Sequence, residues 1–123
     1  MTLVLPWAVL CRDNARHSLM NGRILLTREY REALEAASMV AKSQWRMAPI
    51  EGRVALGVTL FFPDKRRRDI ANYTKMLNDA LSQVVYVDDS QIDELLVQRG
   101  PIDKANPRAE IHVSEITPLN IQG

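Results

Sequence analysis

The chain has 123 residues, a length that fits one domain with a single hydrophobic core and excludes a two-domain enzyme. Hydrophobic residues make up 46% and charged residues 25% of the chain, close to the globular average, which excludes a disordered tail or a fibrous repeat. The net charge of +1 comes from 16 Lys and Arg against 15 Asp and Glu, so the total charge does not by itself indicate a polyanionic partner.

Neither a membrane span nor a disulfide is expected. The longest apolar run, Leu3 to Cys11, is interrupted by Pro6 and is shorter than the roughly 18 to 20 residues that a span needs. The N-terminus lacks the basic-then-apolar arrangement of a signal peptide, and Cys11 is the only cysteine. We therefore expect a compact soluble domain over residues 1–123 in a reducing cytoplasm.

The first half of the chain predicts a strand, a loop and a helix. Residues 2–7 predict a short strand that stops near Pro6, and the polar, turn-rich residues 12–22 predict a solvated loop, with contact to a ligand as the alternative. An amphipathic helix is predicted from Thr27, which suits an N-cap, and Pro49 ends any continuation. Its apolar positions recur at helical spacing: Tyr30, Ala33, Leu34, Ala37, Val40 and Ala41.

The second half predicts strands around one more helix. Residues 53–62 alternate between apolar and small or polar side chains, which is typical of a half-buried strand. An apolar stripe from Ile70 to Val84 predicts a helix whose polar side is free for chemistry. The remaining predictions are a turn at 88–90, a strand around 95–99, a loop over 100–107 and a last strand around 108–114.

These elements predict an α+β fold, a small mixed sheet of about four or five strands with two main helices packed on it. Several successive strands have no helix between them, so a regular parallel wrap is not expected.

Common catalytic motifs are absent. The sequence has no GxGxxG, no GxxxxGK[ST], no HExxH and no cysteine pair for a zinc ribbon. Pro63-Asp64 begins like a family of metal nucleases that also needs an acid two residues before a lysine. No lysine of this chain meets that requirement: Lys42, Lys65, Lys75 and Lys104.

The stretch from Phe62 to Gln91 carries the chemistry that remains. Its carboxylates and Lys75 suit a magnesium-dependent phosphodiesterase, because Mg²⁺ prefers carboxylate oxygens and a lysine can stabilise developing negative charge. The neighbouring basic run would hold a nucleic-acid backbone by charge: Lys65, Arg66, Arg67 and Arg68.

Each of these features also has a structural interpretation. Asp69 before a helix is ordinarily an N-cap, Lys75 on a polar face is ordinarily solvated, and residues 88–90 are ordinarily a turn. His17 is interpreted as a loop residue and His112 as a strand residue. Tyr73 and Trp45 lie on apolar helical faces, which favours core packing over base stacking. The residues alone leave open a nucleic-acid-binding domain or a metal nuclease.

Residues 62–92, FPDKRRRDIANYTKMLNDALSQVVYVDDSQI, resemble the central signature of the RusA family of Holliday junction resolvases. The signature runs Pro-Asp, basic run, Arg-Asp-any-Asp-Asn, Lys, Asp-Ala-Leu and Asp-Asp-any-Gln. The matching residues are Pro63-Asp64, Lys65 to Arg68, Asp69, Asn72, Lys75, Asp79-Ala80-Leu81 and Asp88-Asp89-Ser90-Gln91. Leu5-Pro6-Trp7 is similar to the family's opening strand, so the resemblance covers nearly the whole chain.

The resemblance implies a homodimeric, Mg²⁺-dependent enzyme, often of phage or prophage origin, that cuts four-way DNA junctions by symmetric paired nicks. It implies metal-binding and catalytic roles for Asp69 and Asp89, an active-site role for Lys75, and a supporting metal-binding role for Asp88. It also implies contacts to the junction backbone from the basic run Lys65, Arg66, Arg67 and Arg68.

Ala71 departs from the family pattern, which has a second essential acid at this position. Alanine cannot ligate a metal, so we expect Mg²⁺ binding and cleavage to be severely weakened. An engineered Asp-to-Ala change is the first explanation, and a naturally inactive relative is the second. An enzyme that recruits another acid, such as Asp64 or Asp79, is the third.

Three functions follow from these alternatives. The leading hypothesis is a structure-selective DNA endonuclease whose site is disabled in this chain. A naturally non-catalytic protein that binds DNA junctions or other nucleic acids is the alternative. An RNA-binding module is a more remote one, motivated by the basic run alone.

Overall fold

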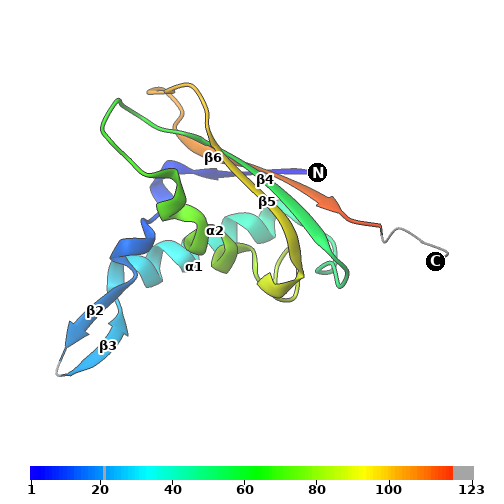
Figure 1. The fold of residues 1–123 in the computed structure, drawn as a ribbon, viewed down its shortest axis with the longest axis horizontal. Helices are drawn as coiled ribbons and strands as arrows, with labels where there is room; N and C mark the ends of the chain where they lie inside the picture. The colour runs from blue at the N-terminus through cyan, green and yellow to red at the C-terminus, as the bar shows by residue number, and fades with distance from the viewer. Residues whose placement is uncertain (21, 118–123) are drawn as a thin grey trace.

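A four-stranded mixed sheet forms the body of the molecule in the computed structural model, which describes residues 1–20 and 22–117 (Figure 1). The strand order is β1-β6-β4-β5, with β4 and β5 parallel and the other neighbours antiparallel. The strands are β1 (Thr2–Pro6), β4 (Val54–Phe61), β5 (Ile92–Arg99) and β6 (Arg108–Glu115). The predicted α+β fold and its irregular, mixed sheet are confirmed.

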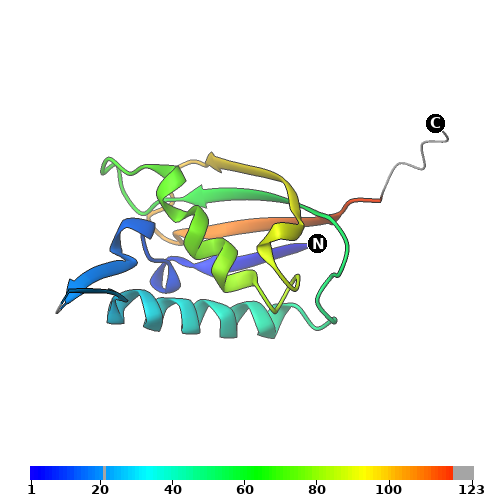
Figure 2. The ribbon, with the colours of Figure 1, turned by 60° about the horizontal axis from the view of Figure 1, so that its bottom comes forward.

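Two helices, α1 (Arg28–Gln44) and α2 (Thr74–Leu81), cover one face of this sheet (Figures 1 and 2). The side chains of β4 alternate between buried and half-buried, and the buried ones face these helices in the core. Thr27 caps α1 as predicted, because its hydroxyl accepts a hydrogen bond from the Tyr30 amide at 3.1 Å. Trp45 and Tyr73 are both buried, which confirms their interpretation as core residues.

The prediction of a solvated loop over residues 12–22 is wrong. A short 3₁₀ turn at Asp13–Ala15 is followed by strand β2 (His17–Met20), which pairs with β3 (Arg23–Leu26) in a hairpin. The hairpin projects away from the body (Figure 1). All four residues of β3 are exposed, and its apolar residues Ile24, Leu25 and Leu26 are consecutive, so no alternation marks the strand in the sequence. His17 is therefore a strand residue, and Asn21 lies outside the described residues.

The second predicted helix is shorter than the Ile70–Val84 stripe suggested. Ile70–Tyr73 form a 3₁₀ turn, and the α-helix itself ends at Leu81. Gln83 then has a positive φ of 68°, which reverses the chain. Val84, Val85 and Tyr86 are buried in this non-helical segment, so their packing in the core, and not a helical stripe, explains their apolar character.

The parallel pairing of β4 with β5 places the residues of interest. A connection between parallel strands must return from one end of the sheet to the other, and α2 makes that return here. The basic run therefore follows the end of β4, while Asp88 and Asp89 directly precede β5, which begins earlier than predicted. No helix in residues 1–20 and 22–117 is long and apolar enough to cross a membrane.

Candidate functional site

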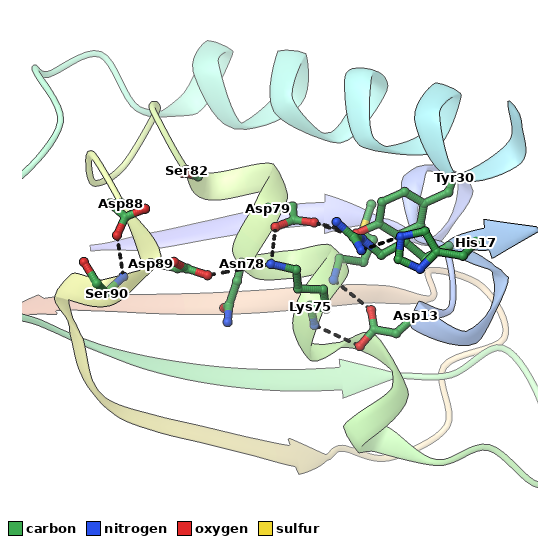
Figure 3. Close-up of polar contacts among 12 residues, drawn as sticks. Asp13, His17, Tyr30, Lys75, Asn78, Asp79, Ser82, Asp88, Asp89 and Ser90 are labelled. Carbon is green, nitrogen blue, oxygen red and sulfur yellow. Dashed lines mark hydrogen bonds and ion pairs between the residues drawn. The ribbon is translucent and has the colours of Figure 1, made fainter. Parts of the chain in front are cut away.

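Lys75 lies on the polar side of α2 between two carboxylates (Figure 3). Its Nζ is 3.1 Å from Asp79 Oδ1, one helical turn further along, and 3.8 Å from Asp89 Oδ2, on the turn before β5. Lys75 and Asp89 lie close together although α2 ends and the chain turns between them. The Lys75 side chain remains about half exposed, which leaves it accessible to an anionic ligand.

Asp79 is held in place from α1 and from the N-terminal segment. The hydroxyl of the buried Tyr30 donates to Asp79 Oδ2 at 2.8 Å, and Arg16 Nε lies 3.7 Å from the same oxygen. Burial and the neighbouring Asp79 raise the pKa of Tyr30 far above its usual range, so the hydroxyl remains a donor. The sequence predicts Tyr30 as a core residue and Arg16 as part of a solvated loop, with ligand contact as the alternative. It does not predict their contacts with Asp79; the four-residue spacing of Lys75 and Asp79 was the available signal.

Asp13 holds the start of α2. Its two carboxylate oxygens accept hydrogen bonds from the Lys75 amide at 2.9 Å and the Met76 amide at 2.8 Å (Figure 3). These amides have no partner within the helix, so a carboxylate from another segment takes the place of an N-cap. Burial raises the pKa of Asp13 despite the two amides. Nothing in the sequence could pair Asp13 with a helix about sixty residues away.

Asp88 and Asp89 have different roles in the turn before β5. The Asp88 carboxylate accepts from the Ser90 amide at 3.0 Å, and hydrogen bonds from Ser90 hold the pKa of Asp88 below its usual range. The side chain of Gln91 completes a capping box by accepting from the Asp88 amide at 2.8 Å. Asp88 and Gln91 thus stabilise the turn, which presents the half-exposed Asp89 carboxylate to Lys75.

Asp69 belongs to a different group of contacts. It is the N-cap of the 3₁₀ turn before α2, where its Oδ1 accepts from the Ala71 amide at 3.1 Å. It also lines a hollow of about 790 Å³ between the N-terminal segment and the basic run. The structural interpretation of Asp69 as a cap is confirmed.

The described residues do not complete a metal site. Within residues 1–20 and 22–117, no three His, Cys, Asp or Glu side chains gather closely enough to hold a metal ion. The Ala71 side chain offers no oxygen ligand, and the Lys75 ammonium lies 3.8 Å from Asp89 Oδ2. The donor set of this chain therefore does not fit a complete divalent-cation site.

The basic run divides into exposed side chains and one embedded side chain. Lys65, Arg66 and Arg67 are exposed. The Arg68 guanidinium instead contacts both oxygens of Asp64, at 2.6 and 3.3 Å, and lies 5.2 Å from the centre of the Trp7 ring. Arg68 is therefore paired in charge and stacked on the core, whereas the other three side chains are exposed, with Arg66 Nε 4.0 Å from Asp64 Oδ2.

The pairing of Asp64 with Arg68 predicts a defined pH dependence of stability. The Arg68 guanidinium and the Arg66 amide lower the pKa of Asp64 from 3.8 to about 2. A lowered pKa means that the ionised carboxylate stabilises the fold above about pH 4, and that this contribution is lost as the pH falls toward about 2. We expect the Asp64→Asn variant to have a lower free energy of unfolding than the parent near neutral pH, with the difference closing over that window.

Urea denaturation of both proteins at a series of pH values measures this difference. Asp103→Asn is not a suitable control, because Asp103 is paired with Arg108. Glu35→Gln, an exposed residue of α1, is the matched control and should leave the pH profile unchanged. A difference for Asp64→Asn that stays constant from neutral pH to about pH 2 would contradict the assignment.

Comparisons with known proteins agree on one family. The sequence model described as "Endodeoxyribonuclease RusA" matches residues 6–114. The chain is 26% identical over 116 residues to the crossover junction endodeoxyribonuclease RusA of Shigella sonnei strain Ss046, and likewise to that of Escherichia coli strain K12, covering 94% of each chain. It is also 26% identical to the protein of that name from Enterobacteria phage 82, over 93% of each chain. On this evidence, the chain belongs to the RusA family of endodeoxyribonucleases.

Proposed function

We propose that the protein binds four-way DNA junctions and that its metal-dependent nuclease activity is disabled at position 71. The observation that carries this proposal is the arrangement around α2. Lys75 and Asp89 are paired at 3.8 Å, whereas the position two residues after Asp69 holds an alanine. The relatives that span nearly the whole chain are named crossover junction endodeoxyribonucleases, which supports junction DNA as the ligand.

The cofactor we propose for the complete site is Mg²⁺, with Asp69 and Asp89 as ligands and Asp88 supporting them. A resolvase nuclease family is consistent with a divalent metal, and carboxylates are the ligands that Mg²⁺ prefers. When bound, such an ion polarises the scissile phosphate and activates the attacking water. Because the donor set of this chain is incomplete, the chain as it stands is not expected to cut DNA.

The replacement Ala71→Asp tests this proposal. Ala71 is exposed on the 3₁₀ turn before α2, so an aspartate side chain can extend into solvent without displacing the core. We expect the variant to bind Mg²⁺ by calorimetry and to make paired, symmetric nicks in a labelled four-way junction. The unmodified chain should bind the junction in the absence of metal and leave it uncut.

Ala71→Asn is the matched control, because it adds a side chain of the same size without the charge. It should restore neither Mg²⁺ binding nor cleavage. If Ala71→Asp binds junctions but neither holds Mg²⁺ nor cuts, then the carboxylates are structural and the alternative applies, a naturally non-catalytic junction-binding protein. The capping contacts of Asp69 and Asp88 are the observations that favour this second candidate.

We also propose a homodimer. A four-way junction is close to two-fold symmetric, and an isologous dimer presents two identical sites to its two equivalent strands. Strand β5 is a sheet edge that carries the exposed apolar side chains of Leu95 (40%) and Leu96 (60%), which supports an interface there. Light scattering after gel filtration should give twice the 14.0 kDa of one chain. A mass of one chain at micromolar concentration would contradict the proposal.

A further inference from the structure

The hollow beside Asp69 is formed by two segments that are distant in the sequence. Trp7 to Asn14 provide one wall, and Arg66 to Tyr73 provide the other. A hydrogen bond from the Asn14 amide to Asn72 Oδ1, 2.9 Å long, joins the walls. The volume of about 790 Å³ lies in the range of small-molecule sites. Lys75, Asp79 and Asp89 do not line this hollow.

The rim of the hollow is suited to an anion. Three exposed arginines line it: Arg12, Arg66 and Arg67. Arg66 lies 4.0 Å from Asp64, whereas neither Arg12 nor Arg67 forms an ion pair within the described part of the chain. Glu29 and Asp69 also line it, so the guanidinium groups outnumber the carboxylates. Arginine binds phosphate oxygens through its planar fork of donors, which makes a single phosphodiester a fitting partner for this rim.

The inner wall of the hollow is suited to a planar ring. The half-buried Trp7 packs edge-on against Phe62, with the ring centres 5.6 Å apart, and the Arg68 guanidinium lies against it. Asp64 accepts two hydrogen bonds from that guanidinium, which orient it against the ring. Nucleobases taken out of the helical stack bind aromatic rings and guanidinium planes of this kind.

Asn72 adds a group that can contact the edge of a base. Its Oδ1 accepts from the Asn14 amide, which fixes the orientation of the side chain. Its Nδ2 has no hydrogen-bond partner among residues 1–20 and 22–117, so two donors remain free on the side chain. Charge, a planar surface and a free amide therefore converge in one cavity.

We propose that this hollow receives one nucleotide that is unstacked at the branch point, with its phosphate on Arg12, Arg66 and Arg67 and its base against Trp7. The inference rests on junction DNA as the ligand and adds a base-reading subsite next to Asp69. A base at a branch point has already lost part of its pairing and stacking, so extruding it costs less than extruding one from an intact duplex. The subsite would select which base lies beside the position of cleavage.

Free mononucleotides test the hollow directly, with the full chain and no metal. The protein has two tryptophans, and Trp45 is an internal reference because it is buried at the opposite end of α1 from Glu29. At 1.5 Å per residue, these two positions lie about 24 Å apart. We expect each 5′-deoxynucleoside monophosphate to shift the Trp7 indole resonance saturably, while the Trp45 resonance stays in place. The four bases should differ in affinity.

Inorganic phosphate and a deoxynucleoside without phosphate are the comparison ligands, and both should bind at least fivefold more weakly than the mononucleotide. If phosphate alone binds equally well, the hollow is only an anion site and the inference is wrong. It is also wrong if the Trp7 resonance does not move, or if both indoles move together.

Two variants assign the binding to the hollow. Asn72→Asp keeps the acceptor for the Asn14 amide but adds negative charge, and Arg12→Gln removes one exposed guanidinium. Each should lower mononucleotide affinity at least fivefold, whereas Arg31→Gln, an exposed arginine of α1, should not. Unchanged affinity in both variants, with native thermal unfolding, would overturn the subsite.

Binding measurements on the parent chain, with mononucleotides, four-way junction and duplex, separate this inference from the proposed function. If the parent chain binds junctions but no mononucleotide, the subsite fails and junction binding stands. If it binds mononucleotides at Trp7 but does not prefer a four-way junction to duplex, the proposed function fails, and with it the role of the subsite at a branch point.

Discussion

In the Ala71→Asp background, replacing Lys75 with alanine is expected to reduce the rate of junction cleavage by about 10² to 10³. The Lys75 ammonium lies 3.1 Å from Asp79 and 3.8 Å from Asp89, and its side chain is half exposed, so it can contact a phosphate brought to Asp89. Its removal takes away the positive charge that would stabilise the negative charge developing on that phosphate. Binding of the junction, which depends on many phosphate contacts, should change by about twofold or less.

Single-turnover cleavage of a labelled junction gives the rate, and a gel-shift titration without metal gives the affinity. Lys42→Ala, which removes an exposed lysine from α1, is the matched control and should affect neither. The stability of Lys75→Ala should stay close to that of the parent, because partly exposed ion pairs contribute about 1 kcal/mol or less. A loss of affinity as large as the loss of rate would argue against a catalytic role for Lys75.

Replacing Arg66 and Arg67 together by alanine should weaken junction binding and flatten its dependence on salt. Each phosphate contact that is lost removes about 0.9 from the slope of log K against log salt concentration, so the double variant should lose about 1.8 per protomer. The fold should be unaffected, because both side chains are exposed and neither packs on the core.

Arg68→Ala should have a different effect. Its guanidinium is paired with Asp64 and stacked on Trp7, so the variant should lose about 1–2 kcal/mol of unfolding free energy. Junction affinity measured over a range of salt concentrations, together with urea denaturation, separates the two outcomes. An unchanged salt slope in the Arg66→Ala/Arg67→Ala variant would mean that these two side chains face away from the DNA. If Arg68→Ala keeps the parent's unfolding free energy but has a lower salt slope, then Arg68 contacts the DNA and does not stabilise the fold.

The elements that could be predicted are those in which one face of the chain is buried. Strand β4 alternates in the sequence because its side chains alternate between the core and the open face of the sheet. Helix α1 has an apolar stripe and a local cap at Thr27, both encoded within a few residues. The β2–β3 hairpin was missed because both faces of β3 are exposed, which leaves no period in the sequence.

The second helix was predicted to extend too far because apolar residues continue beyond its end. Val84 continues the apolar stripe that predicted the helix, yet it is buried, together with Val85 and Tyr86, in a turn that includes Gln83 with its positive φ. An apolar residue signals burial but not the backbone conformation in which it is buried. The stripe therefore extended past the last helical residue, Leu81.

The sequence by itself determined the fold class, the family signature from Phe62 to Ile92, and the alanine at position 71, because these depend on residue type and local spacing. Only the tertiary structure decided how those residues are used. It brought Asp89 to Lys75, capped α2 with Asp13, and stacked Arg68 on Trp7 while Arg66 and Arg67 stayed exposed. These contacts join segments up to about sixty residues apart, and no local pattern encodes which side chains meet when α1 and α2 pack on one sheet.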